Sequence, residues 1–180
     1  MKANHKNWVI LGAVALVLAL APVSQAQLNS NQANVNLNAV LSESLTVAAG
    51  PATVNFALPA SGTAAGSAPV SITTSWVLAP ARTDVNLYAY FSSAVALTDG
   101  GGNNIPTANV SGNFNGGGFN PFTSVTPFAA NGLQLFNQAI AAANRNASRS
   151  DSLALQIDTT GLALPAGTYT GVLNIQAQAI

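Results

Sequence analysis

The sequence contains no cysteine, and after residue 26 it contains no histidine and no lysine. These absences remove most of the side chains that act as nucleophiles, general bases and metal ligands. A Ser-His-Asp or Cys-His arrangement is excluded in that part of the chain. We therefore expect a protein that is not an enzyme, with no catalytic residue and no cofactor.

Charge is also scarce, since only 6% of the residues are Asp, Glu, Lys or Arg. After residue 26 three arginines face five acidic residues, a formal charge of −2. These are Arg82, Arg145 and Arg149 against Glu43, Asp84, Asp99, Asp151 and Asp158. Nucleic-acid binding is not expected, because phosphate contacts need clustered Lys and Arg. We interpret Glu43 and Asp151 as solvated surface charges, since such residues are rarely buried.

The N-terminus has the pattern of a secretory signal peptide. Positive residues are followed by an uncharged apolar run at residues 8–20 and by small residues up to Ala26. This run is shorter than the roughly 20 residues that a membrane-spanning helix needs. We predict that residues 1–26 are cleaved. The mature chain, residues 27–180, is then expected in the periplasm, at the cell surface or outside the cell, with no membrane span.

The mature chain has the length of one domain and shows many short strand patterns. Apolar and polar residues alternate, or β-branched residues gather, between turns rich in Gly and Pro. The segments are residues 35–41, 45–49, 53–58, 70–78, 85–91, 153–158 and 169–180. About seven short strands without a convincing helix predict a single all-β sandwich. Without cysteine, packing and hydrogen-bond ladders must supply its stability.

Three segments between these strands are harder to assign. Residues 99–131 form a Gly-, Asn- and Phe-rich region, which we interpret as a long loop. Residues 132–143 fit either a helical face or a short strand followed by a turn. We favour the strand, because the neighbouring segments are β. Residues 144–152 are interpreted as a polar link.

Two candidate ligand sites are visible. Asp99, Asn103 and Asn104 offer oxygen ligands on a glycine-rich loop, which fits either a weak calcium site or a plain turn. An aromatic surface could be formed by Tyr88 and Tyr90 together with Phe114, Phe119 and Phe122. Such a surface would suit glycan stacking or a protein partner.

Four segments resemble the spore coat protein U family, which includes archaic chaperone–usher pilins. They are residues 33–56 (ANVNLNAVLSESLTVAAGPATVNF), 70–76 (VSITTSW), 86–92 (NLYAYFS) and 164–177 (LPAGTYTGVLNIQA). The resemblance implies an immunoglobulin-like sandwich, exported to the cell surface, whose partners are copies of itself or a periplasmic chaperone and usher. The cysteine pair of that family would fall near residues 44–45 and 75–76, where this chain has none. We expect packing around Trp76 to replace it.

The resemblance also implies β-strand addition, in which one subunit accepts a strand from another. Residues 27–41 are then a donor or an edge strand, with Val35, Leu37 and Leu41 as the interacting side chains. If residues 35–41 are themselves donated, the folded domain should start near Leu45.

The sequence thus supports two functional hypotheses. The first is a secreted, non-enzymatic structural or adhesive surface protein, a pilus- or coat-like subunit that assembles by β-strand addition. The alternative is a carbohydrate-binding module that uses exposed aromatic residues.

Overall fold

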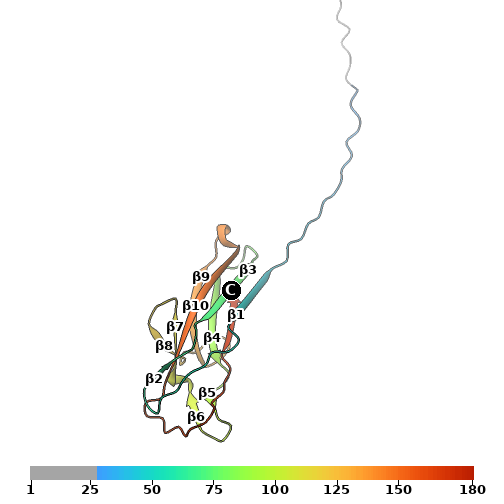
Figure 1. Ribbon diagram of the computed structural model, residues 1–180. Helices are drawn as coiled ribbons and strands as arrows, with labels where there is room; N and C mark the ends of the chain where they lie inside the picture. Colours follow the sequence, from blue (N-terminus) through green and yellow to red (C-terminus); the bar gives the residue numbers. More distant parts are fainter. Residues whose placement is uncertain (1–27) are drawn as a thin grey trace, which may run out of the picture. The chain divides into compact units, whose positions relative to one another are not determined.

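The computed structural model describes residues 28–180, so the predicted signal peptide lies outside the described residues. The described chain folds into β-strands and two short 3₁₀ turns (Figure 1). The strands are β1 (Ser44–Gly50), β2 (Thr63–Ala65), β3 (Val70–Val77), β4 (Asp84–Phe91), β5 (Val95–Thr98), β6 (Asn104–Pro106), β7 (Val110–Phe114), β8 (Phe119–Pro121), β9 (Asn131–Ala139), β10 (Asn146–Asp158) and β11 (Asn174–Ala179). The 3₁₀ turns are η1 (Thr107–Asn109) and η2 (Ala142–Asn144).

The strands form the all-β sandwich that the sequence predicts, with eleven strands in residues 28–180 rather than about seven. The larger sheet has the order β1-β3-β10-β7-β8, and β2 also pairs with β10. The smaller sheet has the order β11-β4-β9, and β5 pairs with β6 in a separate ribbon. All pairings within these sheets are antiparallel.

The core lies between the two main sheets and is almost entirely aliphatic and aromatic. Every second residue of β3 is buried, and so are the inward residues of β4 and β10. Phe91 and Phe122 meet edge to face, with ring centroids 5.2 Å apart. Such pairs add to the stabilisation that burial of their area already provides.

Trp76 lies in this core, as expected, and only 4% of its surface is exposed. Its indole N–H donates to the carbonyl of Asn144 at 2.8 Å, so the buried polar atom is satisfied. On the neighbouring strand Leu45 lies directly opposite Trp76. Leu45 is partly buried and packs against the core cluster to which Trp76 belongs.

Residues 132–139 form a strand, as favoured, but two other expectations are wrong. Residues 99–131 are not one loop, because they contain β6, η1, β7 and β8. Glycine allows this close packing, since a Cβ at Gly112 would lie 2.9 Å from a methyl group of Leu153 and 3.3 Å from the ring of Phe122. Residues 144–152 are not a plain polar link, because residues 146–152 form the first half of β10.

Three predicted strands are shorter than expected or absent. Residues 35–41 carry no strand, and residues 53–58 contribute only an isolated bridge from Phe56 to Gly66. The last strand begins at Asn174 rather than at residue 169. Each of these segments alternates, but alternation alone does not form a strand, because the backbone must also pair with a neighbouring edge.

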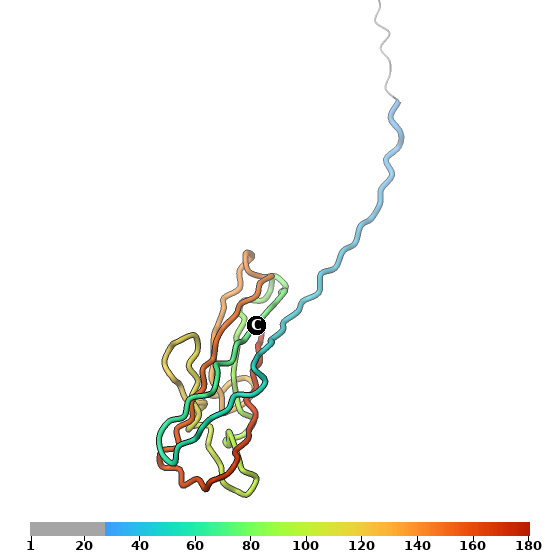
Figure 2. Tube along the Cα trace, in the orientation of Figure 1, coloured from blue at the N-terminus to red at the C-terminus, as the bar shows by residue number. Residues whose placement is uncertain are grey.

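The chain divides into two units, residues 1–39 and residues 40–180. In the first unit, residues 28–39 are exposed throughout and carry no helix or strand. Their Cα trace is extended (Figure 2). In the second unit, the first strand starts at Ser44. This is close to the start expected if residues 35–41 are a donated strand.

A close backbone approach generates the first testable prediction. Thr98 and Thr170 exchange two backbone hydrogen bonds of 2.9 Å, which brings Gly171 against β5. A Cβ at Gly171 would overlap the carbonyl oxygen of Ala96. We expect Gly171→Ala to lower the free energy of unfolding by about 1–3 kcal/mol, because the backbone must shift.

Urea denaturation measures this effect. Gly118→Ala is the matched control, because its Cβ would meet nothing within 4 Å. Equal stability of the two variants would show that the contact at Gly171 does not matter.

Candidate functional site

The two sheets leave two edge strands next to each other, β1 and β11. Within the described residues β1 pairs only with β3, and β11 pairs only with β4. Each strand therefore presents a row of backbone N–H and C=O groups without a ladder partner. Because β1 runs away from the turn at residues 79–83 and β11 runs toward it, the two edges are antiparallel. We call this region the β1–β11 seam.

The core is incompletely covered at the β1–β11 seam. Its inward side chains pack against the core cluster but remain half-exposed, whereas the inward residues of β3 and β4 are buried. These half-exposed residues are Leu45 and Val47 of β1, and Ile175, Ala177 and Ala179 of β11. Apolar surface left in water is unfavourable in proportion to its area, so covering the seam would stabilise the domain.

Neither seam strand carries a charged residue, since their sequences are SLTVAAG and NIQAQA. Natural edge strands are usually protected from pairing by charges, proline or a covering loop. Within β1 and β11 none of these charges or prolines is present.

The N-terminal segment, residues 28–41, has the complementary pattern. Val35, Leu37 and Leu41 are 81%, 93% and 80% exposed. Asn36 and Asn38 alternate with them, so a strand formed here would have one apolar and one polar face.

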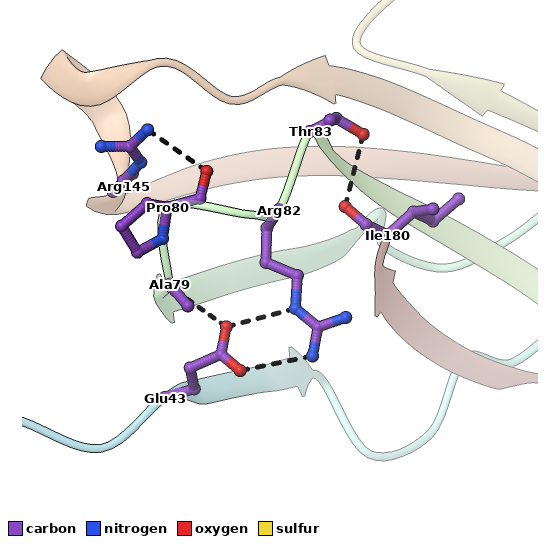
Figure 3. A network of polar contacts seen from close by, with 7 residues as sticks. All are labelled: Glu43, Ala79, Pro80, Arg82, Thr83, Arg145 and Ile180. Atoms are coloured by element: carbon purple, nitrogen blue, oxygen red, sulfur yellow. Dashed lines mark hydrogen bonds and ion pairs between the residues drawn. The ribbon is translucent and has the colours of Figure 1, made fainter.

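A polar network fixes the point where the chain enters β1 (Figure 3). Glu43 accepts the backbone N–H of Ala79 at 2.8 Å. It also accepts two N–H groups of Arg82, at 3.2 and 3.3 Å. The bonds from Arg82, and then that from Ala79, lower the pKa of Glu43 below its ordinary value. The carboxylate is thus charged at neutral pH, and it is exposed, as expected.

The turn at residues 79–83 and the start of β4 also hold the end of β11. The backbone N–H of Thr83 donates to the carbonyl of Ile180 at 2.6 Å, and the N–H of Ile180 donates to the backbone carbonyl of Asp84 at 2.9 Å. Arg145 donates to the carbonyl of Pro80 at 3.3 Å. Sequence reasoning did not find this network, because its members lie far apart in the chain.

Asp151 is not a surface charge, which corrects the expectation. Only 2% of its side chain is exposed, and Arg149 donates to both of its oxygens at 2.7 Å. Asn115 donates a third hydrogen bond at 2.8 Å. The guanidinium of Arg149 also lies 3.9 Å from the centre of the Phe136 ring. This cluster joins the two sheets on the side of β9, and its partners explain why a charge can be buried there.

The predicted aromatic residues do not form one surface. Tyr88 is only 9% exposed and, with Tyr90, packs against Phe128 on the outer face of the smaller sheet. The other predicted rings lie elsewhere: Phe114 packs near Phe136, Phe119 is exposed on β8, and Phe122 is fully buried. Phe128 was missed, because the sequence gives no sign that its loop folds over β4.

The candidate calcium residues form a turn. Asp99 accepts the backbone N–H groups of Gly101 and Asn103 at 2.8 and 3.0 Å. The Asn103 amide donates to its second oxygen at 2.6 Å, and these bonds lower the pKa of Asp99. Asn104 belongs to β6. Residues 28–180 contain no group of three or more His, Cys, Asp or Glu side chains that could hold a metal ion.

One cavity of about 350 Å³ lies between β5 and the chain before β11. Hydroxyl and amide groups line it, among them Ser92, Thr98 and Asn104, together with apolar Val95 and Val172. None of its lining residues is ionisable.

Comparisons of the sequence with family models and with curated proteins find no match. Residues 28–180 also contain no helix that is long and apolar enough to cross a membrane.

The buried ion pair generates a prediction about acid stability. Burial alone would raise the pKa of Asp151, but the bonds from Arg149 and Asn115 and the charge of Arg149 lower it overall. The charged form of Asp151 therefore contributes fully to the free energy of unfolding above the ordinary aspartate pKa of about 4. This contribution is lost as the pH falls through the pKa of Asp151 in the folded state. We expect Asp151→Asn to cost about 1–3 kcal/mol at pH 7 and to flatten the loss of stability below about pH 4.

The free energy of unfolding at several pH values tests this. Asp158→Asn is the control, because it removes a half-buried carboxylate of the same strand that accepts hydrogen bonds from Thr160 alone. A similar cost for both variants would contradict a special role of the buried pair.

Proposed function

We propose that this protein is a secreted, non-enzymatic structural or adhesive surface component whose copies assemble by β-strand addition. Residues 35–41 of one copy are the donated strand, and the β1–β11 seam of another copy accepts them. One observation carries the proposal: the chain contains both a half-covered apolar seam between two uncharged edges and an exposed segment with alternating apolar residues.

Residues 35–41 match the β1–β11 seam in length. Residues 35–41 would span about 23 Å as a strand. β1 has seven residues and β11 has six, so a strand of this length reaches along the whole seam. β1 and β11 approach within 8 Å between Cα atoms, whereas a strand paired with both edges needs roughly 9.6 Å between them. Insertion would therefore move the edges apart, and because they are antiparallel the inserted strand would lie parallel to one and antiparallel to the other.

The side chains also agree in chemistry. With Val35, Leu37 and Leu41 turned inward, the inserted strand would cover Leu45, Val47 and Ile175. Asn36 and Asn38 would then face water. No charge would be buried, since neither the donor nor the seam contains one.

Two further points support a structural role. The candidate sites contain no constellation of nucleophile, base and metal ligand, which supports a non-enzymatic function. The resemblance to the spore coat protein U family and the pattern of residues 1–26 support export and assembly at the cell surface. The carbohydrate-binding alternative stays a prediction, but the separation of the aromatic side chains leaves it without a continuous stacking platform.

Deletion of the N-terminal segment tests the proposal. We expect residues 27–180 to form oligomers that persist in mild denaturant, because releasing a strand breaks a whole ladder and uncovers the seam. The chain from residue 42 onward should be monomeric. Size-exclusion chromatography with light scattering measures the oligomeric state of each form. The proposal would be contradicted if residues 27–180 were monomeric and the chain from residue 42 onward did not bind the deleted segment.

Single substitutions test the apolar face. A labelled peptide of residues 28–41 should bind the truncated domain. Leu37→Asn in the peptide should weaken binding by roughly 10- to 150-fold, because a leucine side chain loses its burial. Asn38→Ser is the matched control on the opposite face and should bind almost as the original peptide does.

A further inference from the structure

We infer that the outer face of the smaller sheet binds a neutral glycan chain through side-chain amides that the fold holds in fixed positions. The residues of this site are Gln134 and Asn137 of β9, Gln176 of β11, Tyr90 of β4, and Phe128 in the loop beside it. We call them the amide face. The site is independent of strand addition, because it lies within residues 40–180 and does not include the paired or open edges of the β1–β11 seam.

A β-bulge in β9 places two amides on the outer face. In a regular strand Gln134 and Asn137 would point to opposite faces, because they are three residues apart and the side-chain period is two. The register of β9 against β4 shifts by one residue at this point. Leu135 and Phe136, the residues between the two amides, are both buried, so both amides lie on the exposed side. Bulges are frequent next to functional sites, where they redirect a side chain.

The two amides converge on one buried residue. Asn86 lies on the outward side of β4, between the inward residues Val85 and Leu87, yet it is only 3% exposed. Its side-chain oxygen accepts an N–H of Gln134 at 3.0 Å and an N–H of Asn137 at 2.7 Å. Fixing an exposed amide costs side-chain entropy, and the bond that fixes it replaces a bond to water. A ligand that binds these fixed amides therefore loses less conformational entropy than one that must order them.

Each amide keeps groups for a ligand. Gln134 and Asn137 each use one N–H on Asn86, which leaves a second N–H and a carbonyl oxygen on each side chain. On the other side of β4, Gln176 accepts the hydroxyl of Tyr90 at 2.9 Å, which leaves both of its N–H groups. Within residues 28–180 the three exposed amides make no other side-chain hydrogen bond. The site thus offers both donors and acceptors.

The surroundings favour an uncharged ligand with apolar faces. Tyr90 and Phe128 are half-buried and stacked, with ring centroids 5.6 Å apart, so part of their ring surface lies beside the amides. Among the outward residues of β4, β9 and β11, only Asp84 is acidic and none is basic. An anionic chain would meet a carboxylate and no positive charge. Sugar rings carry hydroxyl groups that donate and accept, with C–H groups between them, and both match this surface.

The positions of the amides set the length of the ligand. Tyr88 lies opposite Gln134 on one side and opposite Gln176 on the other. These two amides are therefore two strand spacings apart, roughly 10 Å. A ligand that bonds to both is longer than one sugar ring, which favours a chain across the strands over a free monosaccharide.

The amide face differs from the aromatic surface that the sequence predicts. In that surface exposed rings would bind by stacking, and the fold separates Phe114, Phe119 and Phe122 from the two tyrosines. In the amide face only Tyr90 and Phe128 contribute ring surface. The directional contacts come from amides, so a continuous stacking platform is not required.

Calorimetric titration of the mature chain, residues 27–180, with oligosaccharides tests the inference. Cellohexaose, chitohexaose and maltohexaose are the neutral probes, and the hexamer of galacturonic acid is the anionic comparison. We expect at least one neutral probe to bind, and the anionic hexamer to bind more weakly or not at all. Gln134→Ala and Gln176→Ala should each weaken binding by roughly 3- to 10-fold, because each removes a hydrogen bond to the ligand.

Two further variants complete the test. Gln156→Ala is the matched control, because Gln156 is a half-exposed glutamine on β10 in the larger sheet, and it should leave the affinity unchanged. Asn86→Ala keeps all three exposed amides but releases two of them. It should weaken binding through a less favourable entropy of binding, which marks Asn86 as a positioning residue and not as a contact.

Several outcomes would overturn the inference. It fails if none of the three neutral hexamers binds at millimolar concentration, or if the anionic hexamer binds most tightly. It also fails if Gln156→Ala weakens binding as much as Gln134→Ala does. Circular dichroism checks that each variant is folded, and Gln176→Ala on a different strand carries the test if Gln134→Ala unfolds. Because the amide face lies outside the seam, failure here leaves strand addition standing, and the reverse holds too.

Discussion

The pairing of β10 with its neighbours is the interaction on which the rest of the sandwich depends. This strand pairs with β3 along one edge and with β7 along the other, and it also receives β2. Its inward residues Leu153 and Ile157 are fully buried, and its Asp151 is tied to Arg149. Without a disulfide, this central ladder and the core that it carries must hold the larger sheet together. Strands further from β10 have fewer partners, and β1 at the edge is the clearest case.

The burial pattern of β3 could be predicted from the sequence, because its buried residues recur at the period of a pleated strand. Trp76 could be placed in the core for the same reason. The patterns of β4 and β9 could not, because their buried residues do not alternate. The region around β7 and β8 could not, since its glycines and asparagines have no periodic apolar signal. Its packing depends on the contact of Gly112 with Leu153. The residues next to Gly112 in the sequence do not indicate this long-range contact.

The candidate site, too, could be predicted only in part from the sequence. The apolar face of Val35, Leu37 and Leu41 was visible from alternation alone. What could not be seen was that these residues are exposed and carry no strand, because a strand also needs a partner edge, which local sequence does not reveal. Asp151 shows the opposite error. A charged residue between serines looks solvated, and only the arrangement of Arg149, Asn115 and Phe136 in space explains why it can be buried.

The register of β1 has a mechanical consequence. Ser44 lies opposite Val77 and Gly50 lies opposite Ser71, so the whole strand is laid along β3. Tension applied to the N-terminal segment along the axis of β1 enters at Ser44 and loads the hydrogen bonds between β1 and β3 together, in shear. Hydrogen bonds that are loaded together resist more force than hydrogen bonds that break one after another. Glu43 lies where that tension first reaches the domain, so its contacts with Arg82 and Ala79 would take up load before the ladder does.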